Sequence, residues 1–264
     1  MKFLKYLFLF FLIVTSIKKI NSQEVRYVKT PNIIIGNSQK SSFKFEVLIN
    51  SKSEPYFNIS YLLSNKIALF GSYNYINWRN RRYTFLKGLF GNPSYDYVEN
   101  KNHGYSLGFG LLNLFKLGSF NTTEILMGFE SQQLKLREYY PKTIEEIDFI
   151  NQNYNTYFLQ LNITKQLKNK KLKLGYGLKI SYFKLKSLEN QFYYENNLQT
   201  KNLDKNNLFL IALSSNLEYK LIQQKQLFLR LQTSVFGALE DFEYVVNSEG
   251  FWGMRFNIGL LYKL

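Results

Sequence analysis

The chain has 264 residues, of which 45% are hydrophobic and 18% aromatic, with 34 Lys and Arg against 19 Asp and Glu and no cysteine. This composition excludes a disordered chain and a helical protein with many membrane spans. The missing cysteine excludes disulfides, thiolate metal sites and cysteine nucleophiles. The length suffices for one large domain or two small ones.

The N-terminus has the features of a secretory signal peptide. Lys2 and Lys5 precede an uncharged stretch over residues 6–17, and a polar segment ending at Ser22 follows. The stretch is too short to span a bilayer comfortably as a helix. We therefore expect cleavage after residue 22, an N-terminal extension over 23–42 and a folded domain over 43–264. An uncleaved N-terminal anchor is the alternative.

From residue 43 onward, apolar and polar residues alternate with a period of two, which is typical of strands with two different faces. In the last segment Phe256, Ile258 and Tyr262 alternate with Asn257 and other small or polar residues. The pattern recurs, more or less cleanly, over 43–49, 56–64, 67–75, 105–115, 120–131, 157–163, 172–182, 209–219, 226–237 and 252–264. It predicts ten strands, most of about nine to fourteen residues. Eight strands is the alternative count.

Short and long connections alternate between these segments. Short turns fall near residues 64–65, 116–119, 166–170 and 221–225, and longer polar connections near 50–55, 77–103, 132–153, 188–205 and 239–250. Barrels that cross an outer membrane have short periplasmic turns and longer external loops. Soluble sandwiches and barrels have no reason to segregate loop lengths. The sequence therefore predicts an all-β fold, a closed antiparallel up-and-down transmembrane β-barrel with both chain ends on the periplasmic side.

The two faces of the predicted strands also fit a membrane barrel. The apolar face carries almost no charge, and its aromatic residues lie toward strand ends, so we assign Trp252 and Tyr262 to a lipid-facing girdle. The other face carries Gly, Ser, Asn and isolated charges. We expect these charges to point into the lumen: Lys44, Glu46, Glu124, Glu130, Lys173, Lys179, Glu218, Arg230 and Arg255. Because both signs are present, they can pair and fill a narrow barrel; a thin water path is the alternative.

The segment from Asn58 to Tyr73, NISYLLSNKIALFGSY, resembles the first hairpin of small outer-membrane β-barrel proteins of Bacteroidota. The segments 105–110 and 259–264 are similar in style. The resemblance implies a barrel in the cell outer membrane, where its partners are membrane lipid and the barrel-assembly machinery, and it implies no particular activity. The chain departs from the usual assembly signal by ending in Leu264 instead of an aromatic residue, although Tyr262 keeps the alternation.

Candidate chemistry is sparse. His103 is the single histidine and follows Asp96 and Glu99, so an omptin-like surface hydrolase is one hypothesis; a solvated loop histidine is the simpler interpretation. A second acidic group, Glu138, Glu145, Glu146 and Asp148, has the oxygen ligands of a divalent cation, but a solvated acidic stretch is favoured. We expect neither a metal nor a cofactor.

Arg79, Arg81 and Arg82 give the first long connection a basic character. On an exported protein these guanidinium groups would meet phosphates of lipopolysaccharide rather than nucleic acid. Plain solvation of the loop is the alternative.

Together these patterns predict an outer-membrane barrel with a structural, surface-interaction or narrow-pore role and no catalysis. The alternatives are the hydrolase using His103 and an exported soluble β-barrel that binds an apolar ligand. The sequence leaves the oligomeric state open. On the predicted register, Leu178→Arg should impair membrane insertion and Lys179→Leu should be tolerated far better.

Overall fold

The computed structural model describes residues 25–26, 43–50, 55–83, 95–115, 117–118, 120, 122–139, 146–167, 171–194, 197–200, 207–222, 226–238, 245–246 and 253–263. All regular secondary structure in these residues is β-strand. Among them, no helix is long and apolar enough to cross a bilayer.

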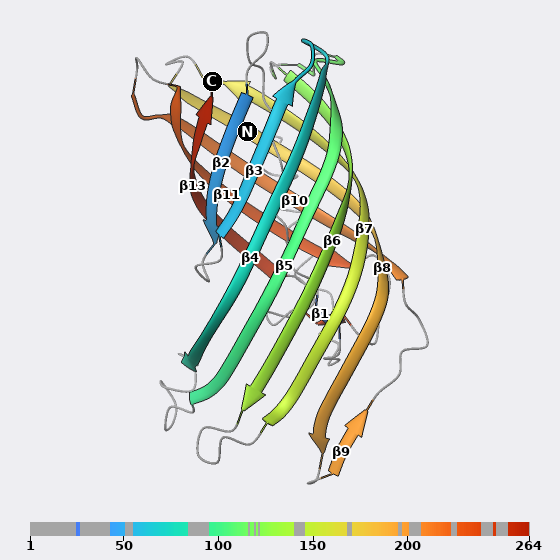
Figure 1. The fold of residues 1–264 in the computed structure, drawn as a ribbon. Coiled ribbons are helices and arrows are strands. Elements are labelled where there is room, and N and C mark those ends of the chain that lie inside the picture. Colours follow the sequence, from blue (N-terminus) through green and yellow to red (C-terminus); the bar gives the residue numbers. More distant parts are fainter. Residues whose placement is uncertain are drawn as a thin grey trace.

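Ten antiparallel strands form a closed barrel (Figure 1). Each pairs with the next along the chain, and the last pairs with the first. The strands are β2 (Phe43–Asn50), β3 (Pro55–Leu62), β4 (Ile67–Tyr83), β5 (Tyr95–Leu112), β6 (Thr122–Tyr139), β7 (Glu146–Gln166), β8 (Leu172–Tyr194), β10 (Asn207–Lys220), β11 (Leu227–Ala238) and β13 (Gly253–Lys263). The predicted up-and-down barrel is confirmed, with ten strands rather than eight.

Three short strands lie outside this ring of ten. β9 (Asn197–Thr200) folds back on the end of β8 as a hairpin. β1 (Val25–Arg26) pairs in parallel with β12 (Val245–Val246), so a piece of the predicted N-terminal extension contacts the connection between β11 and β13.

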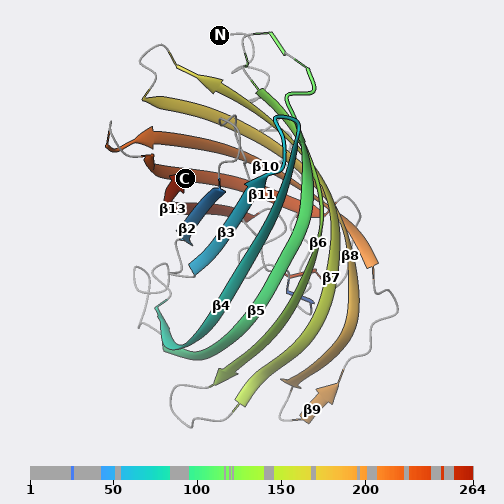
Figure 2. The same ribbon diagram turned by 45° about the horizontal axis from the view of Figure 1, so that its top comes forward.

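The strands differ greatly in length. β2 and β3 have 8 residues each, whereas β4 to β8 have 17, 18, 18, 21 and 23. A tilted strand needs about 9–11 residues to cross a membrane. β4 to β8 therefore continue well past one end of the ring, and Figure 2 shows them sweeping beyond β2 and β3 toward β9. We call this part the projecting wall: residues 75–83, 95–103, 133–139, 146–153 and 186–194.

The projecting wall occupies residues that the sequence had predicted as long connections, so that prediction is wrong for them. Residues 77–83, 95–103, 132–139, 146–153 and 188–194 were predicted as loops but lie in paired strands. Many of these residues are polar whichever way they point, so hydropathy alone shows no period of two there. The strands continue because each main chain completes its hydrogen bonds on its neighbour.

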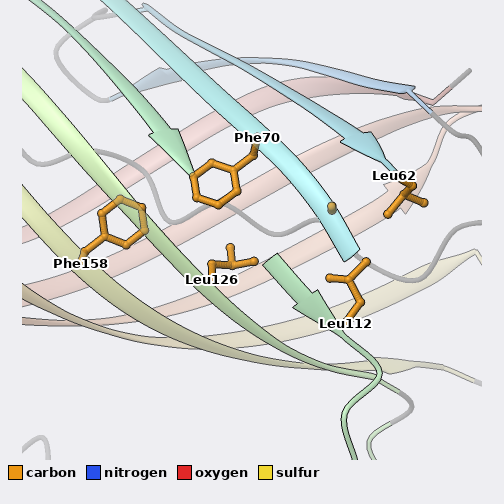
Figure 3. Close-up of a cluster of buried hydrophobic side chains, with 6 residues drawn as sticks. Leu62, Phe70, Leu112, Leu126 and Phe158 are labelled. Atoms are coloured by element: carbon orange, nitrogen blue, oxygen red, sulfur yellow. The ribbon is translucent and has the colours of Figure 1, made fainter. Parts of the chain in front are cut away.

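Inside the barrel, one wall carries a cluster of buried apolar side chains: Leu62, Ala68, Phe70, Leu112, Leu126 and Phe158 (Figure 3). The rings of Phe70 and Phe158 lie 6.1 Å apart, centroid to centroid. Two glycines between them make room, because a Cβ would lie 2.4 Å from Phe70 Cζ at Gly108 and 2.6 Å from Phe158 Cζ at Gly128. Glycine is thus required where aromatic rings from nearby strands cover the barrel wall.

Candidate functional site: apolar belt and charged lumen

The outward face of the barrel carries continuous rows of apolar side chains. The strand register places them side by side from β4 to β10: Ile67, Leu111, Ile125, Leu161, Leu178 and Leu213 in one row, and Leu69, Phe109, Met127, Leu159, Ile180 and Ile211 in the next. Phe57 and Ile59 of β3, Leu231 of β11 and Ile258 and Leu260 of β13 are also exposed, so the apolar surface includes the other strands. We call this surface the belt.

The belt is exposed to an unusual degree. Leu69, Leu159 and Ile258 keep 47%, 49% and 52% of their surface exposed, although large apolar side chains are normally buried. A contiguous apolar surface far larger than a few hundred Å² marks an interface with a partner or with lipid. Within these rows, no described outward side chain is charged.

Aromatic residues line both edges of the belt. Toward the projecting wall, rings contact one another from β5 to β7, with 6.3 Å between Tyr105 and Phe129 and 5.3 Å between Phe129 and Tyr157. At the opposite edge, where β2 begins and β13 ends, Tyr61 and Tyr262 are exposed. Tyrosine at both edges of an apolar band is the arrangement of interfacial girdles. Trp252, the other predicted girdle residue, lies outside the described residues.

The inward face carries the charges. Arg230 of β11 is fully buried and forms an ion pair with Glu46 of β2, reaching across the intervening strand β13. Asn58 Nδ2 donates a hydrogen bond of 2.8 Å to the same carboxylate. Beside the pair, Gln232 donates to Asn216 Oδ1 at 2.7 Å. The charged and amide groups therefore bind one another along the inner face of β10, β11, β13, β2 and β3.

A second buried ion pair lies on another part of the wall. Lys179 Nζ lies 2.5 Å from Glu130 Oε1, and both side chains are almost completely buried. The same ammonium lies 4.2 Å from the centre of the Phe158 ring, which is a cation–π contact. The charged pair thus packs against the apolar cluster of Figure 3.

A third group of charges lies at the end of the barrel where β2 begins and β13 ends. Lys263 Nζ lies 3.5 Å from Glu218 Oε2. Lys44, which pairs with Lys263 in the strand register, is buried, and Lys173, opposite Glu218, is partly buried. Farther round the wall, Glu124 accepts a hydrogen bond of 3.1 Å from Asn162.

The residues predicted to face the lumen therefore lie as follows. Seven are buried: Lys44, Glu46, Glu124, Glu130, Lys179, Glu218 and Arg230. Lys173 is partly buried, and Arg255 occupies a position opposite buried Ser234, while its side chain lies outside the described residues. Sequence reasoning missed the amides that connect these charges, such as Asn216, Gln232 and Asn257. The sequence could have indicated these amides, because each lies two residues from a charge predicted to face the lumen and therefore on the same face of its strand.

The residues predicted in the first long loop lie on strands instead. Arg79, Arg81 and Arg82 are in β4, and their side chains lie outside the described residues. His103 is exposed on β5, opposite Tyr75 and Gln133.

His103 lies apart from the carboxylate of Glu99. Glu99 is four residues earlier on the same face, about 13 Å along the strand, and the side chain of Asp96 lies outside the described residues. In the second acidic group, Glu138 and Asp148 are cross-strand neighbours and Glu146 pairs with Tyr139. Their side chains, and all of Glu145, lie outside the described residues.

No family model matches the sequence, and no curated protein matches it. Solved structures that it resembles include the translocator domain of the autotransporter NalP from Neisseria meningitidis, with a TM-score of 0.43 and 10% identity over 84% of this chain and 86% of that one. The KdgM porin has a TM-score of 0.34 and 14% identity over 84% of this chain and 98% of that one. CarO from Acinetobacter baumannii has a TM-score of 0.31 and 10% identity over 86% of this chain and 99% of that one. Likenesses this distant carry no argument, so the barrel is assigned from its own strand pairing. The resemblance to a Bacteroidota family stays a prediction from the sequence.

Proposed function

We propose that this protein is a membrane-spanning β-barrel of the cell outer membrane, with a structural and surface-interaction role and no catalysis. The observation that carries the proposal is the inversion of the usual protein surface. The belt exposes leucine, isoleucine and phenylalanine, whereas Arg230, Glu46, Lys179 and Glu130 are buried. A soluble ligand-binding barrel would place these two sets the other way round.

Closure of the ring supports membrane insertion. Hydrocarbon offers no hydrogen-bond partner to an open strand edge, so only a closed sheet can cross it. All ten strands pair on both sides through the barrel, and β8 pairs with β10 to complete the ring.

The buried ion pairs support a closed lumen rather than a wide pore. Arg230 and Gln232 keep 0% and 1% of their surface exposed, and Glu130 on another strand keeps 1%. Arg230 binds Glu46, Gln232 binds Asn216 and Glu130 binds Lys179 inside the ring, so we expect no stable ion conductance; the narrow pore is the alternative. The projecting wall gives the protein a surface outside the membrane, and this surface would make the contacts of the proposed surface-interaction role.

The first experiment is electrophoresis of the membrane fraction with and without boiling, followed by single-channel recording in planar bilayers. We expect a heat-dependent shift in apparent mass and no conductance steps. A protein that is recovered in the soluble fraction without detergent would refute the membrane barrel. Regular conductance steps from a heat-shifting protein would refute only the closed lumen.

The non-catalytic assignment has its own test. If a hydrolase activity is detected on the purified barrel, His103→Ala should leave it unchanged, because the register brings no carboxylate beside this imidazole. Loss of that activity in a variant that still shows the heat shift would favour the surface hydrolase.

A further inference from the structure

Three cations gather on the outward face of the projecting wall. Lys101 of β5 lies directly opposite Lys135 of β6, and Arg137 follows two residues later on the same face, opposite Glu99. Side chains in directly opposite positions have Cβ atoms about 4.5–5.5 Å apart, and like charges there repel. With one acid among the four residues, the patch retains a positive charge that an anion would neutralise.

An aromatic ring supports two of these cations. Phe149 of β7 pairs with Arg137, and its ring centre lies 5.1 Å from the guanidinium carbon and 5.4 Å from the ammonium of Lys135. Phe149 is only 7% exposed although its neighbours in the wall are polar. Cation–π contacts with one ring hold both charges in place, so less side-chain freedom is lost when an anion binds.

The patch lies just beyond the layer expected for lipid headgroups. Lys101 is four residues before Tyr105, which lies on the aromatic edge of the belt; this is about 13 Å along the strand, or roughly 10 Å along the membrane normal at the usual tilt. The headgroup layer on each side of the hydrocarbon is about 5–8 Å thick. The side chain of Lys101 is long enough to bend back toward this layer and cover the remaining distance.

We propose that the patch formed by Lys101, Lys135 and Arg137 binds the phosphate of an anionic lipid headgroup in the leaflet next to the projecting wall. Arginine offers paired donors to phosphate oxygens, and the two lysines add charge from the neighbouring strand. Lipid is favoured over soluble phosphate because the belt, which lies on the same strands as the patch, must be covered by acyl chains. The inference rests on the proposed membrane insertion.

The test measures which lipid stays bound to the folded barrel in detergent micelles, by native mass spectrometry with equal amounts of phosphatidylglycerol and phosphatidylcholine. We expect wild type to retain phosphatidylglycerol preferentially. Lys135→Gln/Arg137→Gln should weaken that preference roughly 20-fold, since a basic residue near the surface contributes about fivefold. Glu99→Gln, which removes the acid of the same patch, should strengthen it.

The matched control is Lys66→Gln/Lys171→Gln, which removes two exposed lysines at the opposite end of the barrel. An equal loss of the preference for phosphatidylglycerol in both double variants would mean that the lipid is attracted to any basic protein surface, and it would overturn the proposal. Competition by inorganic phosphate at the same concentration as the lipid would overturn the choice of lipid. Every variant is first checked for the heat shift; a shift retained without lipid preference in wild type would refute the headgroup site and leave the membrane barrel intact.

Discussion

The buried pair between Lys179 and Glu130 gives the sharpest test of the interior. The two groups lie 2.5 Å apart with side chains 4% and 2% exposed. Replacing Lys179 by Met keeps most of the side-chain volume and the contact with Phe158, but it leaves the Glu130 carboxylate without its cation. Removing one partner of a buried pair costs about 3–5 kcal/mol.

This expectation revises the prediction made from the sequence, in which Lys179→Leu was well tolerated because the position faces the lumen. The position does lie on the buried face, but a lumen filled by ion pairs penalises the loss of one partner. The double variant Lys179→Met/Glu130→Gln should recover most of the loss, because it removes both charges together.

The assay is equilibrium urea unfolding of the barrel refolded into lipid vesicles, with the fraction folded read from the heat shift. The two single variants and the double variant form a cycle whose interaction free energy we expect to be at least 2 kcal/mol, within the range for contacting residues, about 0.5–3 kcal/mol. A cost below about 1 kcal/mol for Lys179→Met, or a double variant as unstable as the sum of the singles, would show that the pair is solvated and the lumen open.

Three further outcomes follow from the same geometry. Leu178→Arg places a charge in the middle of the belt and should lower stability in vesicles by about 2–4 kcal/mol; an unchanged urea midpoint would contradict the lipid-facing assignment. Gly128→Ala should cost about 1–3 kcal/mol because its Cβ would meet the Phe158 ring, and Phe158→Leu in the same chain should restore part of it; additive losses would argue against this contact. Glu46→Ala/Arg230→Ala removes the buried pair that reaches across β13 and should introduce conductance steps absent from wild type, whereas a double variant without conductance would mean that other side chains close the lumen.

Much of the barrel could be predicted because a barrel with an apolar outer face and a polar interior requires a strong pattern in short segments. Where one face of a strand is apolar and the other is polar, residues alternate, as from Leu172 to Tyr182. The same alternation put Lys179, Arg230 and Glu46 on one face, and the structure buries all three.

Alternation did not predict the strands of the projecting wall. There the strands of the projecting wall carry polar residues such as Asn77, Lys101 and Asn151 on the outward face, and hydropathy no longer separates strand from loop. Only pairing with neighbouring strands shows that β4 to β8 continue.

The partners of the charges were also beyond the sequence. Alternation tells which side of the sheet Arg230 occupies, but the ring brings it to Glu46, 184 residues earlier in the chain. Likewise, Lys101, Lys135 and Phe149 lie on three different strands, and the register alone makes them neighbours. The sequence by itself determined the faces of the strands, because burial acts residue by residue. The contacts between residues of different strands required the tertiary structure, because barrel closure and strand register bring together residues that no local sequence pattern relates.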